Sequence, residues 1–220
     1  MKLTGVLNVH ALAPGESAGP HATQVAPRIG AQYHQHLFSI RVDPMVDGIR
    51  NSVIESDIVP LPNASTGSAE NWAGNAFVTQ QHTLRSAQEG ARDYDVAKDR
   101  RWTIVNTSRK HYASGNPTGY VLGFKGAIAT LLAAPGSWVV RRAGFARKTL
   151  WIVKDQEDGL GGRMWPAGRY VPQTMDPPKD SVEEWAKGED NIHNDDILLF
   201  ITMGMCFNRL RRLVSDVCLG

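Results

Sequence analysis

Cysteine is scarce in this sequence. Cys206 and Cys218 are the only two cysteines among 220 residues, and both lie near the end of the chain. Two cysteines cannot build the dense disulfide framework of a small secreted domain, and their spacing matches no zinc-binding template. We therefore expect two free thiols.

Long apolar runs and charge of one sign are also missing. Ile197–Ile201 is typical of the longer apolar stretches, and it is far shorter than the roughly 20 residues that a membrane-spanning helix needs. The formal net charge is only +2, and the basic residues are scattered along the chain, whereas nucleic-acid binding uses a concentrated basic face. No membrane and no nucleic acid is therefore expected as a partner.

The first residues lack the features of a signal peptide. The apolar pattern in Met1–Leu7 is short and soon broken, and it reads like a strand entered in mid-course. We expect the sequence to be part of a longer protein. Both the cytoplasm and the peroxisome are compatible with it.

The pattern that is present indicates antiparallel β structure. Short apolar or alternating runs are separated by clusters of Gly, Pro, Asn and Asp. The expected strands are Lys2–Asn8, Gln32–Asp43, Asn51–Val59, Asn75–Leu84, Arg101–Asn106, Thr118–Phe124, Thr149–Lys154 and Asp195–Met203. Helical patterns are limited to a turn or two within Ser86–Lys98 and a short helix over Asp180–Trp185, where Ser181 and Glu184 have capping-box spacing. This predicts an all-β fold, a large antiparallel β-sandwich present here as a partial domain with one or two short helices.

The segment richest in chemistry is a histidine pair. Side chains at positions i and i+2 of a strand point to the same face, so His34 and His36 can present two imidazoles to one ion, with Gln35 on the opposite side. Imidazole suits copper, zinc, iron and nickel, so the pair alone does not identify the metal. Two hydrogen-bonded surface histidines are the alternative reading.

The neighbourhood of the pair resembles copper amine oxidases. The run HQHLFSIRVDPMVDG, at His34–Gly48, is similar to the family segment that carries two of its three copper-binding histidines. Further segments resemble family motifs in the same order: GNAF at Gly74–Phe77, RWTIVN at Arg101–Asn106, PTGY at Pro117–Tyr120, PGS at Pro135–Ser137, RRAGFA at Arg141–Ala146, LW at Leu150–Trp151, NDDI at Asn194–Ile197 and TMG at Thr202–Gly204. The resemblance covers residues 1–205 and leaves residues 206–220 as a divergent tail.

The resemblance implies a primary-amine oxidase, in which an amine, oxygen and water give an aldehyde, ammonia and hydrogen peroxide. It implies two cofactors, copper held by His34 and His36 and topaquinone made from a tyrosine in an Asn-Tyr-Asp/Glu context. It also implies a primary amine as substrate and a homodimer as the assembly. The cofactor tyrosine and the catalytic aspartate base are expected before Met1, so no catalytic or quinone-forming residue is assigned in this chain.

Two positions matter for the comparison with the family. One is a tyrosine that superficially resembles the cofactor precursor, and the other is the expected place of the third copper-binding histidine. Tyr94 is followed by Asp95 but preceded by Asp93 instead of asparagine, and it follows the histidine pair in a polar segment expected to be exposed, so it is not assigned as the cofactor. The third copper-binding histidine is expected at position 207, where the chain has Phe207. Phenylalanine has no lone pair for a metal, whereas the thiolate of the neighbouring Cys206 could bind copper. An altered reading frame or a retained intron would explain the divergent tail.

A second metal site is suggested by two carboxylates. The resemblance places a hard cation, calcium or another, on Asp43 and Asp196 with the backbone carbonyls of Pro44 and Ile197. Asp47 is a further acidic residue that could contribute. Solvated carboxylates at strand ends are the alternative.

Three functions compete. The first is a fragment of an amine oxidase that is inactive as an isolated chain. The second is a non-catalytic β-sandwich remnant that binds metal weakly or offers a surface to a partner. The third is an unrelated β-sandwich with an accidental His-x-His, which the ordered motifs disfavour.

Overall fold

The computed structural model describes residues 8–124, 130–157, 159–171, 174 and 176–207. The chain divides into two compact units, one formed by residues 1–36 and 204–220 and the other by residues 37–203. The strand expected over Lys2–Asn8 lies, apart from Asn8, outside the described residues. Among the described residues, no helix combines the length and the apolar character needed to cross a membrane.

The first unit contains a small antiparallel sheet that the sequence pattern did not predict. It consists of β1 (Val9–Ala11), β2 (Ala22–Ala26) and β3 (Ile29–Gln32) in the order β1-β3-β2. His10 pairs with Gly30 across β1 and β3. A Cβ atom at Gly30 would lie 2.7 Å from the His10 ring, so in this arrangement the ring occupies the space above the glycine.

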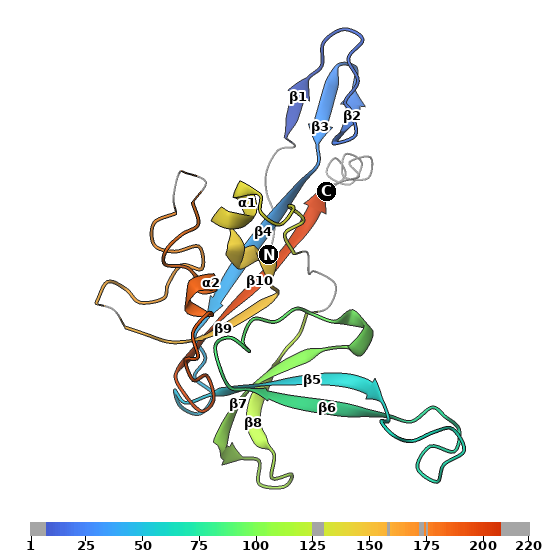
Figure 1. The fold of residues 1–220 in the computed structure, drawn as a ribbon, viewed down its shortest axis with the longest axis vertical. Helices are drawn as coiled ribbons and strands as arrows, with labels where there is room; N and C mark the ends of the chain where they lie inside the picture. Colours follow the sequence, from blue (N-terminus) through green and yellow to red (C-terminus); the bar gives the residue numbers. More distant parts are fainter. Residues whose placement is uncertain (1–7, 125–129, 158, 172–173, 175, 208–220) are drawn as a thin grey trace. The chain divides into compact units, whose positions relative to one another are not determined.

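Two further sheets contain the remaining strands (Figure 1). One has the order β6 (Phe77–Leu84), β5 (Ser52–Pro60), β7 (Arg101–Lys110) and β8 (Pro117–Leu122), and the other has β4 (His34–Val42), β10 (Ile197–Phe207) and β9 (Leu150–Lys154). The seven strands predicted from Gln32 onward are confirmed, with ends displaced by a few residues. All pairings resolved between these strands are antiparallel.

The main hydrophobic core of the second unit lies between the two sheets. Val53 of β5 and Trp102 of β7 pack with Ile152 of β9 and Leu199 of β10 in one cluster. Because both sheets contribute side chains to this core, the unit is a β-sandwich, as predicted.

A second core covers the other face of β9 and β10. Trp151, Leu198 and Phe200 pack there against Val182 of the helix α2 (Val182–Trp185). Ile197, Leu198, Leu199 and Phe200 are consequently all fully buried. Burial on both faces explains why this strand reads as an uninterrupted apolar run instead of an alternating one.

The helices differ from the prediction in detail. Within Ser86–Lys98 only the 3-10 turn η1 (Val96–Lys98) forms, with the Asp95 carboxylate accepting the Ala97 N–H at 3.1 Å. The predicted helix near Trp185 is confirmed as α2, but the capping box predicted for it does not form. The Ser181 side chain makes no capping hydrogen bond, and the Glu184 carboxylate accepts from Lys187 Nζ at 2.5 Å.

Two helical segments were missed. The helix α1 (Trp138–Arg142) begins after Ser137, whose hydroxyl accepts the Val140 N–H at 3.2 Å. The 3-10 turn η2 (Gly144–Arg147) follows it. Both lie in a segment that is too short and too irregular to show helical periodicity.

Candidate functional site

The histidine pair lies at the start of β4. The ring centroids of His34 and His36 are 4.9 Å apart with an interplanar angle of 72°. His34 Nδ1 lies 2.9 Å from the backbone oxygen of Gln32. When Nδ1–H donates to that carbonyl, the lone pair of the neutral ring is on Nε2, the tautomer found in many metal-binding histidines. His34 is half-buried and His36 is exposed. Because their ring centroids are 4.9 Å apart, both imidazoles are within reach of one ion.

Among the described residues, no third ligand atom from His, Cys, Asp or Glu forms a group with this pair. The one group there that brings three His, Cys, Asp or Glu ligand atoms together is a set of aspartates without these histidines. The Gln35 amide donates to Sγ of Cys206 at 3.2 Å. Since Gln35 alternates to the other side of β4 from the two histidines, the exposed, free thiol of Cys206 lies with Gln35. Phe207 is the last residue of β10.

Tyr94 has a structural role in the second unit. It packs against the main core, with its ring centroid 6.5 Å from that of Trp102 and 6.3 Å from that of Phe124. Its backbone N–H donates to Thr149 Oγ1 at 3.2 Å. The expectation that this segment is exposed is wrong, because Tyr94 is half-buried.

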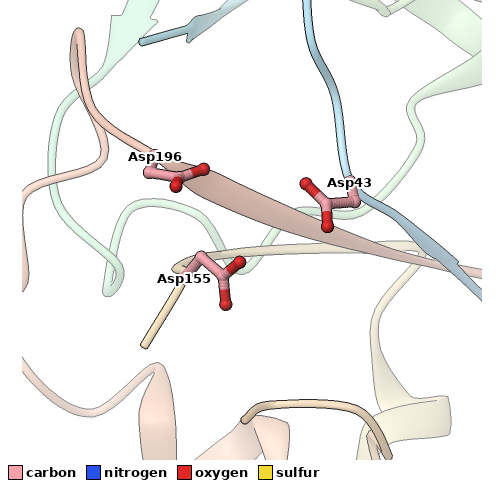
Figure 2. Close-up of side chains that lie close together, drawn as sticks. All are labelled: Asp43, Asp155 and Asp196. Atoms are coloured by element: carbon pink, nitrogen blue, oxygen red, sulfur yellow. The ribbon is translucent and has the colours of Figure 1, made fainter. Parts of the chain in front are cut away.

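Three aspartates meet where three strands end or begin. Asp43 follows β4, Asp155 follows β9 and Asp196 precedes β10. One carboxylate oxygen from each lies within 4.8 Å of the other two, and Figure 2 shows the side chains directed toward the space between them. Asp43 is exposed and the other two are half-buried. We call this set the aspartate triad.

The strand register explains why two members of the triad are neighbours. Lys154 pairs with Ile197 across β9 and β10, so the next residue on each strand, Asp155 and Asp196, lie side by side. The Asp155 N–H donates to the Asp196 carbonyl at 2.9 Å. Asp43 and Asp196 were expected at a cation site and lie together, whereas Asp155 was missed. Antiparallel pairing of the two predicted strands could have revealed it.

The other expected contributors are placed differently. Ile197 begins β10 with its side chain buried in the core, so only its backbone could serve an ion. Asp47 is not part of the triad. Its carboxylate accepts a hydrogen bond from Thr118 Oγ1 at 3.0 Å instead.

The electrostatics of the triad favour a bound cation. Burial raises the pKa of Asp196, and the nearby charges of Asp155, Asp43 and Asp195 raise it further. Burial also acts to raise the pKa of Asp195, but hydrogen bonds from Asn191 and Lys154 outweigh it and the net shift is downward. A cation between the three triad carboxylates would relieve their mutual repulsion, and hard cations such as Ca²⁺ prefer oxygen ligands. The triad therefore fits such an ion.

Two other histidines lie away from both sites. His193 is half-buried with Nδ1 3.0 Å from Ser52 Oγ. His82 is exposed, with Nε2 3.9 Å from a Glu89 carboxylate oxygen.

Comparison with known proteins gives a consistent match. Residues 1–209 match the family model described as "Copper amine oxidase, enzyme domain". The chain is 40% identical over 207 residues to "Copper amine oxidase 1" of Schizosaccharomyces pombe, which covers 93% of this chain and 28% of that protein. It is 37% identical over 206 residues to "Peroxisomal primary amine oxidase" of Pichia angusta, covering 93% of this chain and 29% of that protein.

Solved structures agree with this match. A copper-containing benzylamine oxidase from Hansenula polymorpha superimposes with a TM-score of 0.82 at 27% identity, over 94% of this chain and 31% of that chain. The chain thus spans less than a third of the length of these relatives. By sequence and by fold, the chain belongs to the copper amine oxidase family and corresponds to part of its enzyme domain.

Proposed function

We propose that this chain supplies the copper-binding histidine pair of a primary-amine oxidase. The observation that carries the proposal is the pairing of His34 and His36 at the start of β4, within a segment that matches the family's enzyme domain. In the whole enzyme the reaction would convert a primary amine, oxygen and water to an aldehyde, ammonia and hydrogen peroxide. A bound copper ion would supply the one-electron and oxygen chemistry.

The residues present do not fit the organic cofactor. The five tyrosines are Tyr33, Tyr94, Tyr112, Tyr120 and Tyr170, and none is preceded by asparagine. Phe207 stands where the third copper-binding histidine is expected. We infer that the isolated 220-residue chain binds copper through two imidazoles, more weakly than a three-histidine site, and does not turn over amines.

Copper titration tests the histidine pair. The purified chain is titrated with Cu²⁺ while bound metal is measured by atomic emission and nitrogen ligation by electron paramagnetic resonance. His34→Ala and His36→Ala are each expected to weaken binding at least tenfold, because each removes one of two ligands. Gln35→Ala is the matched control, since Gln35 lies between them and faces Cys206. Equal loss in all three variants would contradict the assignment.

Restoring the third histidine tests the role of position 207. Phe207→His is expected to raise the affinity for Cu²⁺ at least tenfold over the parent chain, because a third nitrogen ligand completes the set implied by the family. Hydrogen peroxide release with methylamine is expected to be absent in both forms. Turnover by the parent chain would overturn the inferred inactivity.

We further propose a hard cation, calcium or a similar ion, at the aspartate triad, with Asp43, Asp155 and Asp196 as carboxylate ligands and the carbonyls of Pro44 and Ile197 as candidates. The clustering of the three carboxylates supports this, as does the raised pKa of Asp196, caused by burial and by neighbouring charges. Ca²⁺ is expected to raise the melting temperature of the chain, and Asp196→Asn to abolish that rise.

A homodimer in a peroxisomal setting is proposed for the whole protein. The name of the Pichia angusta relative supports the location. The alternative function is a non-catalytic remnant that binds metal weakly or offers a surface to a partner. Absence of nitrogen-ligated copper in the titration would favour that alternative.

A further inference from the structure

Arg163 lies next to the aspartate triad without belonging to it. Its side chain is 11% exposed. Nη1 donates to the Lys154 carbonyl at 2.7 Å, and Nη2 donates to Oε1 of Gln156 at 2.9 Å. Lys154 and Gln156 are the two residues that flank Asp155, so one guanidinium group binds the backbone on one side of Asp155 and a side chain on the other.

Further contacts fix the guanidinium group itself. Nη2 lies 3.4 Å from Asp190 Oδ2, an oxygen that also accepts from Gln156 Nε2 at 3.2 Å. The guanidinium carbon lies 5.4 Å from the ring centroid of Trp185. A planar fork with several simultaneous partners restricts rotation far more than a lysine ammonium would.

Arg41 connects Arg163 to the opposite side of the triad. Its Nε donates to the Arg163 carbonyl at 3.3 Å, and its Nη1 lies 3.3 Å from Asp43 Oδ2. The contacts therefore run from Asp43 through Arg41 and Arg163 to both neighbours of Asp155. The two triad members that follow strand ends are held by the same pair of arginines.

We propose that Arg163 is a positioning residue for a divalent cation at the triad, which it serves by fixing the backbone around Asp155. The proposal rests on the proposed cation site. Asp155 opens the loop that joins β9 to α2. Without a clamp, its carboxylate would have to be ordered each time the ion binds, and that ordering lowers affinity.

Whether the removal of Arg163 weakens or strengthens cation binding distinguishes a positioning role from simple charge repulsion. A guanidinium beside the site repels a divalent cation, so its removal should strengthen binding if charge alone matters. Removal should weaken binding if Arg163 holds the ligand in place. Partners that orient metal ligands typically contribute about 10- to 100-fold in affinity.

Calcium binding to the full chain tests the proposal. Arg163→Met and Arg163→Lys are titrated with CaCl₂ by calorimetry, and the rise in melting temperature at saturating Ca²⁺ is measured in parallel. Both variants are expected to bind Ca²⁺ about tenfold more weakly than the parent. Arg147→Met is the matched control, because Arg147 pairs with Glu183 and does not contact the triad, and its affinity should equal that of the parent.

The outcomes are distinct. Unchanged or tighter Ca²⁺ binding by the Arg163 variants overturns the positioning role while the cation site stands. If the parent binds Ca²⁺ no better than Asp196→Asn, the cation site fails and the inference fails with it. If the Arg163 variants do not fold, Gln156→Ala replaces them, since it removes one arm of the clamp and should weaken Ca²⁺ binding by up to about tenfold. Unchanged affinity in that variant also overturns the proposal.

Discussion

At the scale of single residues, Glu55 shows how a buried carboxylate is accommodated. It is 4% exposed, and it accepts from Trp102 Nε1 at 2.9 Å and from Arg92 Nε at 2.7 Å. Arg100 Nη2 lies 3.5 Å from its other oxygen. A buried charge is tolerated when it is paired and hydrogen-bonded in this way.

Glu55→Ala is expected to destabilise the chain by about 3 kcal/mol, because it leaves the Trp102 N–H and the Arg92 guanidinium without their acceptor. Urea unfolding followed by tryptophan fluorescence measures the change. Asp99→Asn is the control, since it removes only an exposed pair with Arg101, and it should change stability by no more than about 0.5 kcal/mol. Equal losses in both variants would contradict the role given to Glu55.

Asp57 predicts a dependence of stability on pH. The bidentate hydrogen bonds from Arg100, at 2.8 Å each, lower the pKa of Asp57 below its ordinary value of 3.8. Because the folded pKa is below the unfolded one, this stabilisation is complete above the ordinary pKa and is lost as the pH falls through the folded pKa. Asp57→Asn should therefore lose stability at pH 6 and show a smaller further loss between pH 4 and pH 3. Urea midpoints at these pH values measure it, and an unchanged acid dependence would contradict the prediction.

At the scale of elements, the sequence predicted best those strands with a clear pattern. The start of β7 shows such an alternating pattern, because Trp102 and Ile104 are buried in the core and the polar Thr103 separates them. The sheet of β1, β2 and β3 was not predicted, since strands of three to five residues carry too few alternations to stand out from turns. The capping box at Ser181 had the right spacing, but spacing cannot show that Glu184 reaches Lys187 instead.

The loop between β5 and β6 is organised by Asn71, which is 8% exposed. Its amide nitrogen donates to the Ala64 carbonyl at 2.9 Å, and its amide oxygen accepts the Ala76 N–H at 3.0 Å. Asn71→Ala should unfold the loop locally, so that amide hydrogen exchange over residues 61–76 accelerates at least tenfold. Exchange in β9 and β10 should stay unchanged, and acceleration there would mean that the loop is not an independent unit.

At the scale of the molecule, large apolar side chains remain on the surface of the second unit. Trp72, Phe77, Tyr112 and Tyr120 are each at least 70% exposed. Solvent contact with so many aromatic groups favours association. We expect the isolated chain to self-associate at micromolar concentration, as measured by size-exclusion chromatography with light scattering. A monomer with a sharp cooperative melt across a dilution series would contradict this.

The residues of the candidate sites differ in whether the sequence could predict them. His34 and His36 could be predicted because two positions on one strand share a face. Asp43 and Asp196 came from the family resemblance. Finding Asp155 would have required the pairing register of two predicted strands, and Arg163 depends on hydrogen bonds within an irregular loop that carries no periodic pattern. Periodic patterns describe the residues of a single strand or helix and therefore indicate neither contact.

The aspartate triad joins positions 43, 155 and 196 of one chain. An ion held by all three would act as a reversible cross-link that closes two long loops of the polypeptide. A disulfide restricts the unfolded chain permanently, whereas such an ion leaves when the chain unfolds and stabilises the folded state by binding to that state alone. The stability of the sandwich would then follow the free calcium concentration, so that a chelator would act on it as a reducing agent acts on a disulfide-bonded protein.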